Sequence, residues 1–160
     1  MTTMTVSHLG EVRHEHRARV REILDATGAF RSEEIDVALE LLDEGEPSYE
    51  FVGLYADDAL IGYACYGATP GTDGTWDLYW IAVHPANQGG GAGSSLLEEV
   101  ERRLRDRDAR LLLVETSSRA DYALTRAFYE RRGYAERSRV RDFYAPGDDR
   151  VLYVKDLRAR

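Results

Sequence analysis

A strand pattern that leads directly into glycines and then into a helix pattern restricts the folds open to this chain. Residues 76–83 are aromatic and β-branched and precede His84-Pro85, which predicts a central strand. Gln88-Gly89-Gly90-Gly91-Ala92-Gly93 follows, and a helix with one apolar face is expected from Gly93 to about Asp108. Amides and the helix dipole at such a start favour an anion. The segment therefore predicts a phosphate-binding turn or, alternatively, a plain flexible connector.

Two other phosphate-binding motifs fit this segment poorly. A nucleoside-triphosphate loop places Lys and then Ser or Thr after its last glycine, whereas Gly93 is followed by Ser94-Ser95. A dinucleotide-binding loop follows the first strand of a mostly parallel sheet. Here the glycines come in mid-chain, after two helix patterns and a hairpin pattern. The spacing excludes the first motif and weighs against the second.

The first half of the chain shows two helix patterns and then a hairpin pattern. Apolar residues at helical spacing with a closing glycine predict the first helix, and a serine N-cap begins the second. Two strand-forming runs around an Asp-Asp turn predict the hairpin. The expected elements are a helix from Leu9 to Thr27 ended by Gly28, a helix capped by Ser32 and ending before Gly45, the strands Tyr49 to Tyr55 and Leu60 to Tyr66, and the turn Asp57-Asp58.

The second half predicts one buried strand, one helix and a last pair of strands. A continuous apolar run after a helix indicates a strand parallel to the preceding one. The expected elements are the strand Leu111 to Thr116, a helix capped by Asp121 and ended by Gly133, and strands over 134–144 and 151–157 around the turn 146–149. The chain is thus expected to be one α/β domain over residues 1–160, in the order α-α-β-β-β-α-β-α-β-β, with a mixed central sheet flanked by helices.

Composition narrows the partners and the compartment. The 160 residues suffice for one sizeable core, and 29 acidic against 21 basic residues give a net charge of −8, which disfavours nucleic acid and anionic membrane surfaces. No signal peptide or membrane span is evident, and Cys65 alone in an apolar run indicates a core thiol. We therefore expect a cytoplasmic protein. His14 and His16 lie two apart on different helix faces, so no metal site is expected.

Two motifs in sequence order resemble the GNAT superfamily of acetyl-coenzyme A-dependent N-acetyltransferases. The first family signature is Gln or Arg, two residues of any kind, Gly, any residue, then Gly or Ala, and Gln88 to Gly93 matches it. The second is a helix that ends in an aromatic-Tyr pair before a Gly-aromatic step, which Ala127 to Tyr134 matches. The resemblance covers nearly the whole chain and implies a GNAT fold.

The resemblance also implies how acetyl-CoA, or coenzyme A, would bind. The pyrophosphate would lie on amides of the glycine loop at the helix N-terminus, and no metal is needed. The pantetheine arm would pair with the backbone of the signature strand, next to a local splay between the strands of Val83 and Leu113. A backbone N–H near Val83 would stabilise the oxyanion. The implied cofactor-binding residues are Ile81, Ala82, Val83, Gln88, Gly89, Gly90, Gly91, Ala92, Gly93, Ser94 and Tyr129.

Each step of acetyl transfer to an amine has a candidate residue. Tyr129 matches the family tyrosine that protonates the leaving thiolate, although a helix tyrosine can also simply pack on the core. Asp77 lies 88 − 77 = 11 positions before Gln88, the offset of the glutamate base in the histone acetyltransferase branch. It is expected to be buried beside the aromatic residues Trp76, Tyr79 and Trp80, and it is either the base, a substrate-binding carboxylate or a solvated charge. Glu115 is the second candidate base. His84 is better explained as a strand-end residue than as a base.

The acceptor is expected to be a primary amine: a small molecule, a peptide N-terminus or a lysine. Acidic walls near Glu50, Asp77 and Glu115 favour a cation, and Tyr79 is a further candidate substrate contact. Many family members have Asn seven positions before the tyrosine, but 129 − 7 = 122 is Tyr122 here. Tyr122 is a candidate substrate contact; alternatively, residues 115–122 mark a separate subgroup or form an ordinary loop and helix cap. The alternative is a non-catalytic coenzyme A-binding or regulatory module. The resemblance also allows a homodimer.

Overall fold

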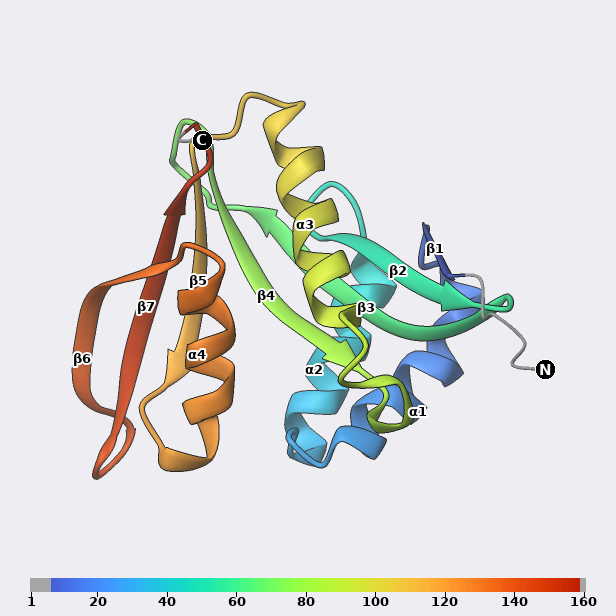
Figure 1. Ribbon diagram of the computed structural model, residues 1–160, viewed down its shortest axis with the longest axis horizontal. Coiled ribbons are helices and arrows are strands. Elements are labelled where there is room, and N and C mark those ends of the chain that lie inside the picture. The colour runs from blue at the N-terminus through green and yellow to red at the C-terminus, as the bar shows by residue number, and fades with distance from the viewer. Residues whose placement is uncertain (1–6, 159–160) are drawn as a thin grey trace. The chain divides into compact units, whose positions relative to one another are not determined.

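The computed structural model describes residues 7–158 as helices on a mixed sheet (Figure 1). The predicted α/β class and mixed sheet are confirmed. In chain order the elements are β1 (Ser7–Gly10), η1 (His14–His16), α1 (Arg17–Thr27), α2 (Ser32–Glu44), β2 (Glu50–Ala56), β3 (Ala59–Ala68), β4 (Thr75–Val83), η2 (Pro85–Asn87), α3 (Ala92–Arg105), β5 (Leu111–Ser117), η3 (Ala120–Tyr122), α4 (Ala123–Arg131), β6 (Ala135–Ala145) and β7 (Asp148–Asp156).

The sheet has the strand order β1-β2-β3-β4-β5-β7-β6. β4 and β5 pair in parallel from Thr75↔Leu111 to Leu78↔Val114, as the apolar run after a helix predicts. β1 pairs with β2, β2 with β3, and β7 with both β5 and β6, all antiparallel. By their contacts the residues form two compact units. Unit 1 extends to Gly67 and includes Trp80–Leu104, and unit 2 comprises Ala68–Tyr79 and the chain from Arg105 onward.

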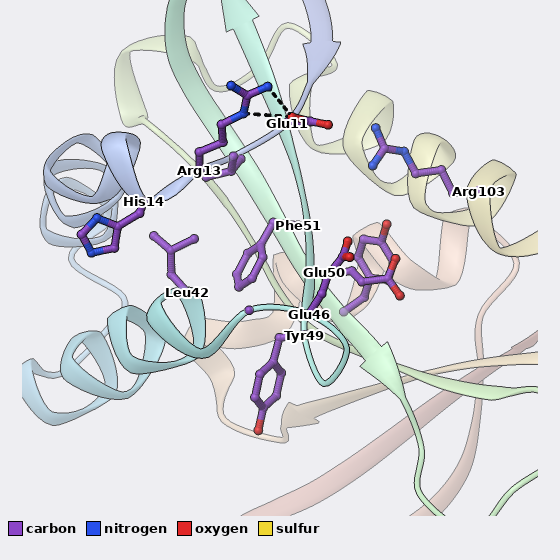
Figure 2. A pocket seen from close by; sticks show the side chains of 12 residues that line it. Glu11, Arg13, His14, Leu42, Glu46, Tyr49, Glu50, Phe51 and Arg103 are labelled. Atoms are coloured by element: carbon purple, nitrogen blue, oxygen red, sulfur yellow. Dashed lines mark hydrogen bonds and ion pairs between the residues drawn. The ribbon is translucent and has the colours of Figure 1, made fainter.

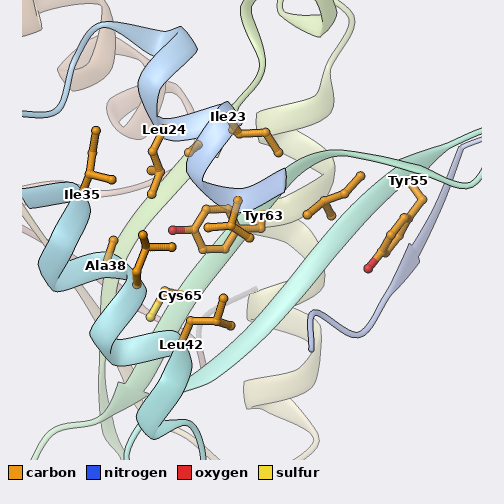
Figure 3. Close-up of a cluster of buried hydrophobic side chains, with 12 residues drawn as sticks. Ile23, Leu24, Ile35, Ala38, Leu42, Tyr55, Tyr63 and Cys65 are labelled. Carbon is orange, nitrogen blue, oxygen red and sulfur yellow. The ribbon is translucent and has the colours of Figure 1, made fainter. Parts of the chain in front are cut away.

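The core of unit 1 joins α1 and α2 to β3 (Figure 3). The apolar stripes of both helices are buried as their spacing predicts, including Val20 and Ile23 from α1 and Leu39 from α2. They pack around Tyr63 and Cys65 of β3, which are fully buried. The predicted role of Cys65 as a core thiol is therefore confirmed.

Helix α3 buries one face and exposes the other. Leu96, Leu97, Val100 and Leu104 have no exposed surface. On the outer side, Glu99 pairs with Arg102 and with Arg103, the latter at 3.1 Å, as helical neighbours do. This amphipathic pattern holds the start of α3, where the glycines lie, against the sheet of unit 1.

The core of unit 2 lies on one face of its strands. Leu112 and Val114 of β5 and Val151 and Tyr153 of β7 are buried, and Tyr129 of α4 stacks on Tyr153. Gly133 follows α4 with φ 89°, the left-handed conformation expected of a residue that ends a helix. The residues between these positions on β5 and β7 point to the other face and stay partly exposed.

The N-terminal segment differs from the sequence prediction. Instead of a helix from Leu9, the chain forms β1, whose Leu9 pairs with Leu54, and α1 begins only at Arg17. The pairing with β2 satisfies backbone groups across more than forty residues of sequence, and no local pattern shows it. Ser32 is also not an N-cap. Arg31 occupies that position with an extended backbone, and its N–H donates to Glu34 Oε1 at 3.2 Å.

The turn between the last two strands has fewer residues than predicted. β6 ends at Ala145 and β7 begins at Asp148, so the turn is shorter than residues 146–149.

Across residues 7–158, every helix falls short of the length and apolar character that a bilayer crossing requires.

A glycine in β3 brings the end of β4 and the start of α3 close together. A Cβ on Gly62 would lie 2.9 Å from Ala82 O and 3.3 Å from Leu96 Cδ1, within unit 1. We expect Gly62→Ala to lower the free energy of unfolding by about 1–3 kcal/mol, because backbone must shift. Gly90→Ala, whose Cβ meets no atom within 4 Å, is the control and should change it by less than about 0.5 kcal/mol. Urea denaturation measures both, and equal stabilities would contradict the close approach.

Candidate active site

A hydrogen-bonded turn connects the end of β4 to α3. The His84 N–H donates to Ile61 O at 2.8 Å, which extends the contact with β3 past Val83. The His84 Nδ1 atom accepts from the Ala86 N–H at 3.1 Å, so its ring caps η2, in agreement with a strand-end role. Gln88 Nε2 donates to Val83 O at 3.0 Å and closes the turn. The signature glutamine thus fixes the path of the chain that follows it.

The glycines after Gln88 form an open loop. Gly89 and Gly91 have φ angles of 84° and 83°, a region that side chains rarely adopt. No atom lies within 4 Å of a Cβ built on Gly89, Gly90 or Gly91. The Ser95 N–H donates to Gly91 O at 2.9 Å. The amides that precede Ser95 lie at the start of α3, before the first hydrogen bond of the helix. The loop can therefore receive an anion at the positive end of α3.

The parallel ladder between β4 and β5 covers only part of each strand. The ladder ends at Leu78↔Val114, although β4 continues to Val83 and β5 to Ser117. Ile81, Ala82 and Val83 therefore lie beyond this ladder. Ala82 and Val83 are buried, which directs recognition at this edge to the backbone rather than to side chains.

Tyr129 has a buried ring and a hydroxyl that makes no hydrogen bond to the described residues. The residue is 5% exposed, and its ring contacts those of Phe128, Tyr134 and Tyr153. Within residues 7–158, the Tyr129 hydroxyl makes no hydrogen bond. Every fully buried side-chain oxygen among these residues does make a hydrogen bond, so the Tyr129 oxygen is not fully buried and keeps some solvent contact. Burial raises the pKa of Tyr129 above its ordinary value of 10.0. The phenol is therefore protonated at neutral pH and able to donate.

Both candidate bases lie on the partly exposed face of unit 2, which we call the open face. It is formed by alternate residues of three strands, and their side chains point away from the core of unit 2. These residues are Asp77 and Tyr79 of β4, Leu113 and Glu115 of β5, and Leu152 and Val154 of β7.

Asp77 keeps one carboxylate oxygen available. Its Oδ2 accepts the Thr69 hydroxyl at 2.7 Å, and within residues 7–158 its Oδ1 has no hydrogen-bond partner. The side chain is half-buried rather than buried, and strand alternation puts the neighbouring Trp76 on the opposite, buried face. Of the three aromatic neighbours expected beside it, Tyr79 shares its face and is 38% exposed.

Glu115 has both carboxylate oxygens engaged. It accepts the Tyr144 hydroxyl at 2.7 Å through Oε2 and is ion-paired with Arg150 through Oε1. These partners come from β6 and β7, so the carboxylate links the last hairpin to β5. An engaged carboxylate is less suited to accept a proton than one with an open oxygen.

Sequence reasoning missed three contacts of the two carboxylates. Thr69, Tyr144 and Arg150 lie 8, 29 and 35 residues from the carboxylates they hold. Only the register of the strands brings the last two to Glu115, and no local signal indicates them. Thr69 lies only eight residues before Asp77, but no sequence pattern indicates that its hydroxyl donates to this carboxylate.

Glu50 lines a pocket within unit 1 of about 330 Å³ (Figure 2). The pocket includes Arg103, which follows Ala92 at the start of α3 by about 16 Å of helix rise. The pocket therefore lies toward the opposite end of α3 from the glycine loop. Its lining residues are Glu11, Val12, Arg13, His14, Leu42, Gly45, Glu46, Tyr49, Glu50, Phe51, Tyr66 and Arg103.

Tyr122 lies at the start of α4 and is half-buried. Its N–H donates to Arg119 O at 3.0 Å as the last residue of η3. In the part of the chain that the structure describes, no three His, Cys, Asp or Glu side chains gather as metal ligands would. The roles of Tyr122 and Glu50 toward a substrate stay predictions.

Known proteins resemble this chain in sequence and in fold. The sequence profile of the acetyltransferase (GNAT) family matches residues 17–134. A GNAT-family protein from Desulfovibrio desulfuricans is 41% identical, with a TM-score of 0.89 over 96% of this chain and 99% of that chain. No curated protein matches the sequence.

Two more distant solved structures share the fold. The ribosomal-protein-S18-alanine N-acetyltransferase from Escherichia coli is 22% identical, with a TM-score of 0.80 over 95% of this chain and 94% of that chain. An aminoglycoside 6'-N-acetyltransferase complexed with coenzyme A is 14% identical, with a TM-score of 0.77 over 96% of this chain and 98% of that chain. The family profile and the 41% identical relative cover most of this chain, which therefore belongs to the GNAT acetyltransferase family.

Proposed function

We propose that this protein transfers the acetyl group of acetyl-CoA to a primary amine by direct attack, with the whole chain acting as one N-acetyltransferase domain. The observation that carries the proposal is the glycine loop, which faces open space at the start of α3. Anions bind well at such helix starts. A relative of the same fold was solved with coenzyme A.

The residues present fit the cofactor. Its pyrophosphate would lie on amides from Gly89 to Ser94, where the glycines leave room for phosphate oxygens. The backbone of Ile81 to Val83 would hold the pantetheine arm, because this part of β4 lies beyond its ladder with β5. When bound, acetyl-CoA supplies the activated thioester.

Tyr129 and Asp77 would move the protons. The neutral amine attacks the thioester carbon, the C–S bond breaks, and Tyr129 donates its phenolic proton to the departing sulfur. Asp77 Oδ1 accepts the proton that the amine loses, directly or through water. We prefer Asp77 to Glu115 as the base because Glu115 is held by Arg150 and Tyr144. An N–H near Val83 would stabilise the oxyanion.

Relatives of this fold act on quite different amines. The Escherichia coli enzyme is named for an alanine of ribosomal protein S18, and another relative for an aminoglycoside. We therefore propose an amine acceptor and assign Tyr79 to its contacts, together with Tyr122 and Glu50. A homodimer and a cytoplasmic location belong to the same proposal.

A negative charge placed in the glycine loop should block the cofactor without unfolding the protein. We expect Gly90→Glu to weaken acetyl-CoA binding at least about tenfold, because a carboxylate would face the pyrophosphate in a loop with no steric conflict. Ala26→Glu on the exposed side of α1 adds the same charge elsewhere and should bind like the parent. Calorimetric titration with ADP and NAD as controls measures this. If Gly90→Glu binds acetyl-CoA with unchanged affinity, the pyrophosphate does not bind at this loop.

Removal of one hydroxyl should separate catalysis from binding. We expect Tyr129→Phe to lower kcat by about 10²-fold or more, since a general acid contributes this much, while acetyl-CoA affinity stays unchanged. The ring remains in place against Tyr134 and Tyr153, so stability should change little. Release of the coenzyme A thiol with an amine acceptor gives the rate. A variant as fast as the parent would assign the proton to another group, and a parent that binds acetyl-CoA without turnover would favour the non-catalytic module.

A further inference from the structure

The open face surrounds a single available carboxylate oxygen with apolar side chains. Asp77 pairs in register with Leu113, and Leu113 pairs with Val154. Leu113 and Val154 are partly exposed, and Tyr79 on the same face is 38% exposed. A ligand that reaches Asp77 Oδ1 therefore contacts hydrocarbon and an aromatic ring around it.

The Asp77 carboxylate is held in place by a braced turn. Thr69 donates its hydroxyl to Asp77 Oδ2, and its N–H donates to Thr75 O at 2.9 Å. The Thr72 hydroxyl bonds Thr69 O at 2.8 Å, and Arg110 Nε bonds Asp73 O at 2.6 Å. Since these contacts fix one oxygen of the carboxylate, the other has a defined direction.

The remaining charges of the open face are compensated or distant. Asp156, two residues past Val154 in β7, is ion-paired with Arg158. Glu115 is ion-paired with Arg150, so it offers little to a second cation. Asp148 accepts the Ser117 hydroxyl and lies beyond Arg150 in β7. Ser117 itself is four residues past Leu113, the register partner of Asp77, or about 13 Å along the strand. Near Asp77, the open face can thus neutralise one positive charge.

Building on the proposed function, we infer that the acceptor is an amine with one positive charge on an apolar or aromatic body. Its ammonium pairs with Asp77 and releases one proton to solvent. The neutral nitrogen then attacks, and Asp77 accepts the proton that this nitrogen loses as the amide forms. Its body covers Leu113 and Val154, which removes apolar surface from water. On the open face, the further ammonium groups of a polyamine or an aminoglycoside would lie over Leu113 and Val154, which offer them no acceptor, and this is unfavourable. Glu50 belongs to unit 1 and is not part of this face.

The test compares amines of different charge at saturating acetyl-CoA, with the full chain and thiol release as the readout. We expect kcat/KM for 2-phenylethylamine and hexylamine to exceed that for spermidine and kanamycin at least tenfold. An amidated peptide with a free N-terminus and only apolar side chains carries the same single charge. Its rate tells whether the apolar body is a small molecule or a peptide.

A charge added to the open face should change this preference. Leu113→Glu places a second carboxylate beside Asp77 and should raise the spermidine to hexylamine ratio of kcat/KM at least tenfold. Val154→Glu, one strand farther from Asp77, is the second variant should the first fail to fold. Leu113→Met keeps the surface apolar and should keep the parent's ratio.

The outcomes separate this inference from the proposed function. A parent enzyme that prefers spermidine or kanamycin would overturn the single-charge acceptor and leave acetyl transfer intact. If the spermidine to hexylamine ratio of kcat/KM is unchanged in both Leu113→Glu and Val154→Glu, the acceptor does not bind on the open face. This result would also overturn the inference and leave acetyl transfer intact. Acetyl-CoA binding without acetylation of any amine would remove the proposed function and this inference with it.

Discussion

The parallel ladder between β4 and β5 is the interaction on which the candidate site depends. It joins Thr75–Leu78 to residues 111–114 and then ends, although both strands continue. Ile81, Ala82 and Val83 at the end of β4 therefore lie beyond this ladder, and their backbone groups are not part of it. A longer ladder would satisfy these groups inside the sheet and leave an extended ligand nothing to pair with. The strand then leads into the glycine turn, so both backbone sites are consecutive in sequence.

The features that sequence predicts best here are local. The strand before the glycines, the loop, the apolar face of α3 and the buried strand after it depend on residue patterns within about 15 positions, and the structure confirms these elements. β1 was missed because its residues are extended only by pairing with β2. The Arg31 cap was missed because side-chain preference points to Ser32.

The carboxylates illustrate why a site is harder to predict than a fold. Asp77 and Glu115 are both acidic residues on neighbouring parallel strands, and sequence alone cannot rank them. Their difference comes from partners supplied by register: Arg150 and Tyr144 for Glu115, and Thr69 for Asp77. The motif that implied coenzyme A is local, whereas the groups that hold and orient each carboxylate are not.

The burial of the sole cysteine affects how this enzyme tolerates oxidation. Cys65 has no exposed surface, and burial raises the pKa of its thiol, so almost no thiolate forms at neutral pH. Thiolate is the species that attacks disulfides and peroxides. An acetyltransferase releases coenzyme A, itself a thiol, in each turnover. Because this chain presents no reactive sulfur, its own product cannot become attached to it as a mixed disulfide when the surroundings turn oxidising.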